Sequence, residues 1–85
     1  MKAKRIVYKN KPIYLPFQVS LPEDPTAEET VHNRFGGGSC TLPAFAVAVY
    51  DVIMGSEMLQ DWKSHRQGLD WFIKYFPKQY MVLLD

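Results

Sequence analysis

The sequence has one cysteine, two histidines and no long hydrophobic run, and each shortage argues against a class of protein. Cys40 alone cannot form a disulfide within the chain or supply a cysteine-based zinc site. The most apolar stretch, Thr41 to Gly55, is shorter than the roughly 20 residues that a membrane-spanning helix needs. The start of the chain lacks the apolar core and cleavage site of a signal peptide. We therefore expect a protein of the reducing cytoplasm with no membrane partner.

An excess of one charge is also lacking. Ten basic and nine acidic residues leave a formal net charge of +1, which gives no overall attraction to nucleic acid or to a membrane. The charges are nevertheless segregated, because residues 1–11 contain bases without an acid and residues 23–29 contain acids without a base. We expect the two segments to lie near each other or to be solvated, and a nucleic-acid-binding arm is the alternative.

Aromatic residues, in contrast, are plentiful, at 14% of the 85 residues. A chain of this size buries only about 60% of its unfolded surface, so we expect some rings to lie on an interface. Trp71 and Tyr75 are four residues apart and lie off the main apolar face of their predicted helix, which makes them the candidate interface anchor. The alternative is that a wide apolar stripe buries both. The excess of rings predicts a homo-oligomer or an obligate protein partner.

The apolar stretch Thr41 to Gly55 predicts a central buried helix. It is too long for a buried strand, and its alanines favour a helix. Thr41 is the expected N-cap, Pro43 suits the first turn, and Gly55 with Ser56 is expected to end this helix and start the next. A second helix is predicted from Glu57 to Phe76, ended by Pro77 and packed antiparallel to the first.

The remaining elements are shorter. Arg5 to Lys9 is rich in strand formers, a turn is predicted at Asn10 to Pro12, and strict alternation from Ile13 to Leu21 predicts a strand. A short helix from Pro25 to Arg34 is predicted behind an Asp24 cap, and Tyr80 to Leu84 is predicted to be a last strand.

The sequence thus predicts one domain, residues 1–85, of the α+β class. Its small antiparallel sheet would consist of the N-terminal hairpin and the C-terminal strand. The sheet would pack on an αα-hairpin that a short helix precedes.

A glycine-rich loop in front of the predicted central helix is the candidate anion-binding site. Backbone N–H groups at a helix N-terminus favour an anion. The loop lacks the lysine of a P-loop and the dinucleotide fingerprint, so a tight turn is the alternative. The candidate residues are Arg34, Gly36, Gly37, Gly38, Ser39, Cys40 and Thr41.

Catalytic and metal chemistry has little support in the sequence. A helix N-terminus can lower the pKa of a thiol, so Cys40 with His32 as base is the one candidate for a nucleophile. His32 and His65 are too few for a metal site unless carboxylates such as Glu28 or Asp61 join them. We therefore predict no enzyme, no metal and no cofactor.

Two stretches, HNRFGGGSCTLPAFAVAVYDVIMG and GLDWFIKYFPKQYMVLLD, resemble a small protein encoded by marine tailed cyanophages. The resemblance covers roughly residues 32–85. It implies a setting in the host-cell cytoplasm or the virion, and it carries over no activity and no site.

The function that the sequence favours is that of a non-catalytic interaction protein, acting through self-association or by binding another protein. The alternative is a nucleic-acid-binding module. It would use the basic N-terminus, interleaved with Tyr8 and Tyr14, together with Lys63, Arg66 and Lys74 of the second helix. A cysteine-dependent enzyme is the least favoured possibility.

Overall fold

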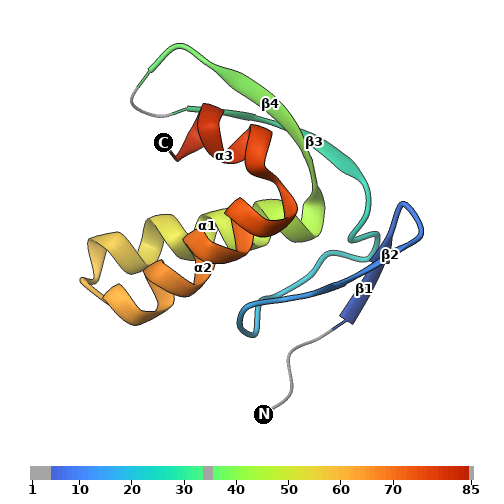
Figure 1. Ribbon diagram of the computed structural model, residues 1–85, viewed down its shortest axis with the longest axis horizontal. Helices are drawn as coiled ribbons and strands as arrows, with labels where there is room; N and C mark the ends of the chain where they lie inside the picture. Colours follow the sequence, from blue (N-terminus) through green and yellow to red (C-terminus); the bar gives the residue numbers. More distant parts are fainter. Residues whose placement is uncertain (1–4, 34–35, 85) are drawn as a thin grey trace.

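The computed structural model describes residues 5–33 and 36–84, and within them the chain forms two small antiparallel sheets and three helices (Figure 1). The α+β class predicted from the sequence is confirmed. In chain order the elements are β1 (Arg5–Tyr8), β2 (Lys11–Tyr14), β3 (Glu28–His32), β4 (Ser39–Pro43), α1 (Ala44–Met58), α2 (Trp62–Tyr75) and α3 (Pro77–Leu83).

The predicted N-terminal hairpin is confirmed as β1 paired with β2. Its turn lies one residue earlier than predicted. Lys9 and Asn10 both have positive φ, 52° and 64°, as a two-residue hairpin turn with the right-handed twist requires.

The strand predicted from Ile13 to Leu21 is wrong beyond Tyr14, where β2 ends. The alternation instead marks an irregular segment that lays every second side chain on the core. Leu15 is buried, and Phe17 and Val19 pack against the core while partly exposed.

The central helix exists, but it begins at Ala44, because residues 41–43 belong to β4. Thr41 pairs with Thr30 in the sheet and is not a cap. The first N–H groups of α1 are instead satisfied by a turn earlier in the chain. The N–H of Ala44 donates to the carbonyl of Ala27, and the N–H of Phe45 donates to that of Pro25, both at 2.8 Å.

The helix predicted from Pro25 to Arg34 is wrong. Asp24 forms a local turn, in which its carboxylate accepts hydrogen bonds from the N–H and hydroxyl of Thr26. The chain then enters β3, which pairs with β4 in register from Glu28 opposite Pro43 to His32 opposite Ser39. Acids that resemble the first turn of a helix are thus exposed strand residues. Arg34 lies outside the described residues.

The two long helices pack against each other as an antiparallel hairpin, as predicted. The break between them lies after Met58 and not at Gly55, so Ser56 is a buried residue of α1. Gln60, with φ of 58°, closes α1. The N–H of Gln60 donates to the carbonyl of Glu57, and that of Asp61 donates to Ser56, which is the pattern of a Schellman motif. Asp61 then caps α2.

The predicted C-terminal strand is wrong, because Tyr80 to Leu83 belongs to α3. Pro77 ends α2 as predicted, but it also stands in the first turn of α3, where its missing N–H costs nothing. The helix α3 packs along β4. The side-chain amide of Asn33 ties α3 to the end of β3 by donating to the carbonyl of Val82 at 2.7 Å.

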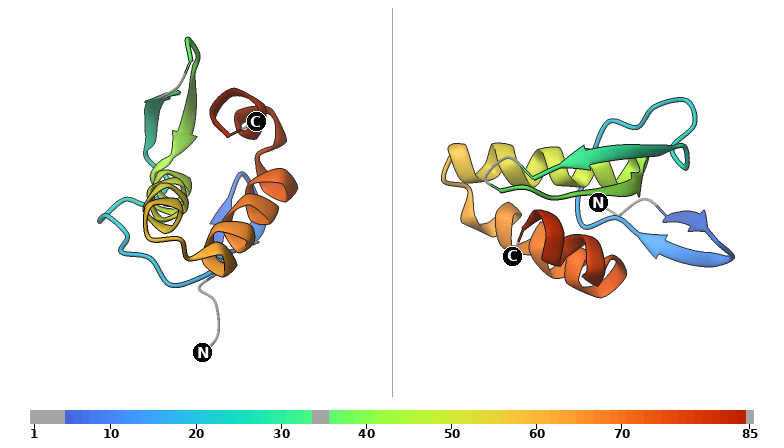
Figure 2. Two further views of the ribbon diagram at one scale, coloured as in Figure 1. Left: turned by 90° about the vertical axis from the view of Figure 1, so that its left-hand side faces the viewer. Right: turned by 90° about the horizontal axis from the view of Figure 1, so that it is seen from above.

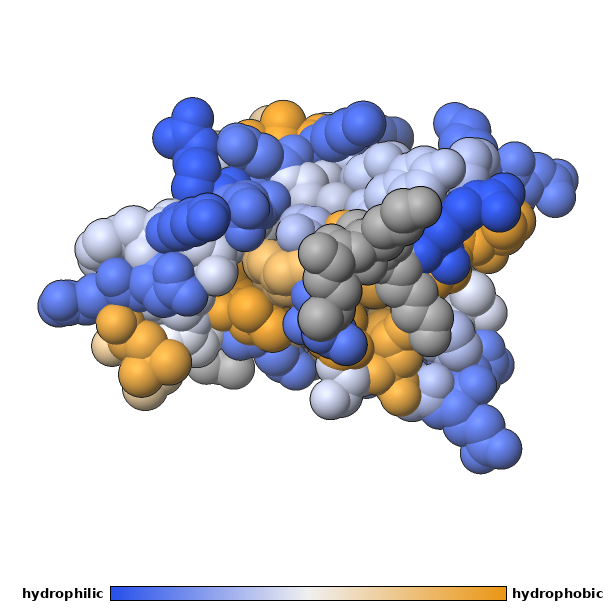
Figure 3. Space-filling model, turned by 90° about the horizontal axis from the view of Figure 1, so that it is seen from below, coloured by the Kyte–Doolittle hydropathy of each residue, from blue (hydrophilic) through white to orange (hydrophobic). Residues whose placement is uncertain are grey.

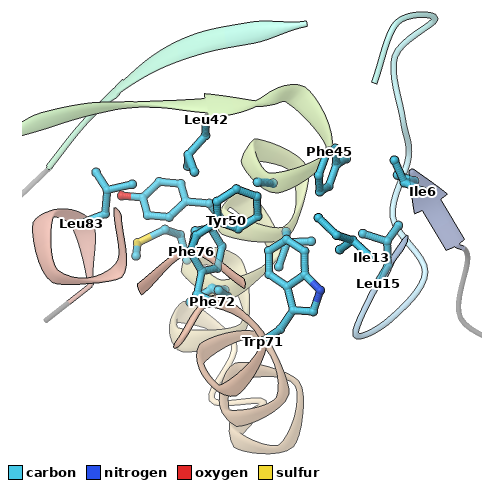
Figure 4. Close-up of a cluster of buried hydrophobic side chains, with 14 residues drawn as sticks. Ile6, Ile13, Leu15, Leu42, Phe45, Tyr50, Trp71, Phe72, Phe76 and Leu83 are labelled. Atoms are coloured by element: carbon cyan, nitrogen blue, oxygen red, sulfur yellow. The ribbon is translucent and has the colours of Figure 1, made fainter. Parts of the chain in front are cut away.

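Five rings from α1, α2 and the α2–α3 junction lie in the core, surrounded by aliphatic side chains (Figure 4). Phe45 lies 6.3 Å from Trp71 and 6.1 Å from Phe76, measured between ring centroids. The indole N–H of Trp71 donates to the carbonyl of Tyr14 at 2.8 Å, which ties α2 to the end of β2. Most of the aromatic excess is therefore used inside the chain.

Candidate functional site

A groove of about 760 Å³ is lined by the N-terminal hairpin, by the end of the β3–β4 sheet at which Glu28 pairs with Pro43, and by the α2–α3 junction. The hairpin and its β1 and β2 labels lie on the right of Figure 1. Its floor is apolar and includes Ile13, Pro43 and Phe76. Its charged lining consists of four lysines and one acid: Lys9, Lys11, Lys74, Lys78 and Glu28.

The four lysines converge from different elements. Lys9 lies in the hairpin turn and Lys11 at the start of β2, while Lys74 lies in the last turn of α2 and Lys78 in the first turn of α3. All four are exposed. Because one acid faces four bases, the groove is positive although the chain as a whole is nearly neutral.

A tyrosine stands beside a lysine on each side of the groove. The Lys9 Nζ lies 5.4 Å from the ring centroid of Tyr8, and the Lys74 Nζ lies 5.1 Å from that of Tyr75. Both rings are half-buried. Tyr8 packs edge-on against Phe45 at 5.4 Å, and Tyr75 lies 5.6 Å from Trp71. The core thus holds both rings in place while each still lines the groove.

The structure brings together only part of the basic set predicted for nucleic-acid binding. Lys74 lies in the groove with two lysines of the N-terminal hairpin, whereas Lys63 and Arg66 do not line it. Arg66 instead pairs with Asp70 at 3.3 Å on the exposed face of α2. Sequence reasoning missed Lys78, although the order Lys-Tyr-Phe-Pro-Lys at residues 74–78 offered a signal.

The glycine loop does not precede a helix, so the premise of the predicted anion site is wrong. Gly36, Gly37 and Gly38 lie between β3 and β4, and Ser39, Cys40 and Thr41 are strand residues. The first two N–H groups of α1 already donate to backbone carbonyls, so they are not available to an anion there. The alternative interpretation, a turn between two elements, fits.

Cys40 is a half-buried strand residue, paired with Val31 in the sheet. Burial raises the pKa of its thiol. This is opposite to the activation expected at a helix N-terminus, since a raised pKa leaves less thiolate at neutral pH. His32 is on the neighbouring strand, one position along from the residue that pairs with Cys40, and it pairs with Ser39.

The other titratable candidates lie apart from the groove. The Nε2 of His65 is 3.9 Å from the Glu57 carboxylate, and its ring meets Trp62 edge-on. Across residues 5–33 and 36–84, three or more potential metal-ligating side chains do not gather anywhere at a distance suited to one ion.

The prediction that Trp71 anchors an interface is wrong, because its side chain is only 5% exposed and packs inside the chain. Tyr75 is half-buried and belongs to the groove. The apolar residues that are fully open to solvent lie elsewhere. Met58 and Leu59 are 82% and 81% exposed at the connection of α1 to α2, beside Trp62 at 57%. Figure 3 shows an apolar patch at this end of the molecule.

Comparison with known proteins adds no relative, since no family model, no curated protein and no solved structure matches the chain. Among the helices in the described part of the chain, each is too short or too polar to traverse a bilayer.

Proposed function

We propose that this protein is a non-catalytic binding module whose groove holds a short segment of single-stranded nucleic acid. The observation that carries the proposal is the convergence of four exposed lysines on a groove that also presents two tyrosine rings. Single strands are bound in this way without sequence preference, by a positive groove along the backbone and by aromatic rings under the bases.

The lysines supply the attraction to phosphate. Lys9 and Lys11 stand on the hairpin, and Lys74 and Lys78 stand across the groove on the helices, so a backbone that follows the groove meets ammonium groups on both sides. Each neutralised phosphate releases counterions, which makes the affinity dependent on salt.

The tyrosines supply the stacking surface. Tyr75 is held from behind by Trp71 and Tyr8 by Phe45, so neither ring has to be ordered when a base arrives. Preorganised rings of this kind lose little conformational entropy on binding. The lysine ammonium that now lies near each ring would move to the phosphate next to the stacked base.

The setting implied by the resemblance, the cytoplasm of an infected cell or the virion, is part of this proposal. Mass spectrometry of purified virions and of infected-cell lysate tests which setting holds the protein.

The groove is tested by charge reversal with a matched control. Lys74→Glu and Lys78→Glu should each weaken binding of a single-stranded oligonucleotide, measured by fluorescence anisotropy at low salt. Lys63→Glu changes the same charge on α2 outside the groove and should have a much smaller effect. With four phosphate contacts, the logarithm of the association constant should fall with the logarithm of the salt concentration with a slope of about −3.

Two results would contradict the proposal. One is undetectable binding of single-stranded DNA and RNA by the unmodified protein at low salt. The other is an equal loss in Lys63→Glu and Lys74→Glu, which would show that total charge and not the groove governs the interaction. Tyr75→Leu separates stacking from charge, since it should weaken binding without changing the salt slope.

The exposed end formed by Met58, Leu59 and Trp62 favours a second candidate function, the binding of another protein. Contiguous apolar side chains on a small protein often mark such a contact. The variant Met58→Ser with Leu59→Ser should then abolish capture of a protein partner and leave oligonucleotide binding unchanged. Equal capture by the variant and the unmodified protein would exclude this end as the contact.

A further inference from the structure

The outer edge of β3 is open. Figure 2 shows the β3–β4 hairpin projecting from the helices, with β4 between β3 and α3. Within the described residues β3 pairs only with β4, and four of its five residues are exposed, Val31 being half-buried. The strand carries two acids, Glu28 and Glu29, but neither the proline nor the lysine that most often protect an edge from pairing.

The hydrogen bonds at the two ends of the hairpin fix which backbone groups face outward. The N–H of Asn33 donates to the carbonyl of Gly38, and the N–H of Ala44 donates to that of Ala27. In an antiparallel ladder every second residue is hydrogen-bonded to the partner strand. Glu29 and Val31 therefore bond to β4, and Glu28, Thr30 and His32 direct their N–H and C=O groups away from it.

We propose that β3 pairs with β3 of a second copy of this chain, antiparallel and about a two-fold axis at Thr30. The sheet then has four strands and runs through both copies. Thr30 lies opposite Thr30 of the second copy, and Glu28 lies opposite His32 of the second copy, twice by symmetry. All outward groups are used, in about six backbone hydrogen bonds. This inference goes beyond the groove and rests on different observations, although Glu28 belongs to both surfaces.

The side chains favour this register and direction. Glu28 and His32 project from the same face, so a carboxylate meets an imidazole, which can donate a hydrogen bond to it in either protonation state. A shift of two residues would place Glu28 opposite Thr30 and lose one hydrogen-bonded pair. A parallel arrangement in register would place the acids of both strands beside each other, and like charges directly opposite destabilise a sheet.

Sedimentation equilibrium over a concentration series, without nucleic acid, tests the pairing. Because each contact occurs twice, His32→Glu should raise the dimer dissociation constant about tenfold. Glu28→Lys alone should also weaken the dimer. The double variant Glu28→Lys with His32→Glu places opposite charges across the axis and should restore the dimer.

A backbone test is independent of charge. Thr30→Pro removes an N–H that faces outward, so the dimer should be lost while circular dichroism stays that of the unmodified protein. Val31→Pro, the control, removes an N–H that bonds to β4 and should destabilise the monomer itself. In hydrogen exchange, the amides of residues 28, 30 and 32 should become protected as the concentration rises.

The proposal is overturned if the unmodified protein stays monomeric at every concentration. It is also overturned by a dimer in which these three amides remain unprotected, or by a double variant that dimerises no better than His32→Glu. None of these outcomes bears on binding in the groove.

Discussion

Two glycines in the helical hairpin show how the same residue can be replaceable at one position and required at another. A Cβ on Gly55 would meet no atom within 4 Å, whereas a Cβ on Gly68 would overlap the side chain of Ile53 and come within 3.6 Å of Phe17. Ile53 is fully buried and has no room to move. Gly68 therefore lies at a close contact between α1 and α2 that leaves no space for a Cβ, and Gly55 lies on an open side of its helix.

We predict that Gly55→Ala raises the free energy of unfolding by about 0.5–1 kcal/mol, because alanine loses less conformational entropy in a helix. Gly68→Ala offers the same gain in helix propensity but overpacks the contact, and it should lower the free energy of unfolding by about 1–3 kcal/mol. Urea denaturation measures both. Equal effects of the two substitutions would contradict this account of the helix contact.

Gln60, in the connection between these two helices, adopts a backbone conformation that is unfavourable for a residue with a side chain. Its positive φ of 58° is a conformation that glycine adopts freely and other residues do not. Gln60→Gly should therefore raise the free energy of unfolding, by about 1 kcal/mol. Gln60→Ala, which has the same backbone preference as glutamine there, is the control and should show no such gain by thermal melting.

At the scale of the element, the start of α2 depends on one carboxylate. Hydrogen bonds from the side chain and the backbone N–H of Ser64 lower the pKa of Asp61. A carboxyl group whose pKa is lower in the folded protein contributes stability above its unfolded pKa, about 3.9, and this contribution is lost as pH falls through the folded value.

Asp61→Ala should therefore reduce the melting temperature at neutral pH, and the difference from the unmodified protein should shrink as pH falls below about 4. Asp61→Asn keeps a capping oxygen that does not titrate, so its melting temperature should lack this component of the pH dependence. A difference between Asp61→Ala and the unmodified protein that is constant from neutral to acid pH would show that the cap contributes nothing through its charge.

The sequence predicted elements well where a pattern is long and local. The two long helices and the N-terminal hairpin follow from apolar periodicity and from strand formers on either side of a turn. It failed at residues 28–32, where acids suit a helix start but the partner strand lies beyond a loop. It also failed at residues 80–83, because four apolar positions fit either period. The groove was predictable only in part, since its lysines are brought together by the docking of the hairpin on the α2–α3 junction.

At the scale of the whole molecule, charge is distributed unevenly although the total is small. The groove lining sums to +3 and the entire chain to +1, so the remaining surface sums to −2. A polyanion is therefore attracted to the groove more strongly than to the rest of the protein taken together. Net charge alone argues against nucleic acid, whereas the local charge of the groove supports the proposal made above.

The different surroundings of the two tryptophans give the molecule an internal optical probe. Trp71 is buried and donates its indole N–H to β2, whereas Trp62 is open to solvent at the end of the helical hairpin. In a Trp62→Phe variant the remaining emission should lie at short wavelength and resist iodide quenching until the N-terminal hairpin detaches from α2. The fluorescence of Trp71 would then report whether the N-terminal hairpin, which forms one wall of the groove, is docked on α2.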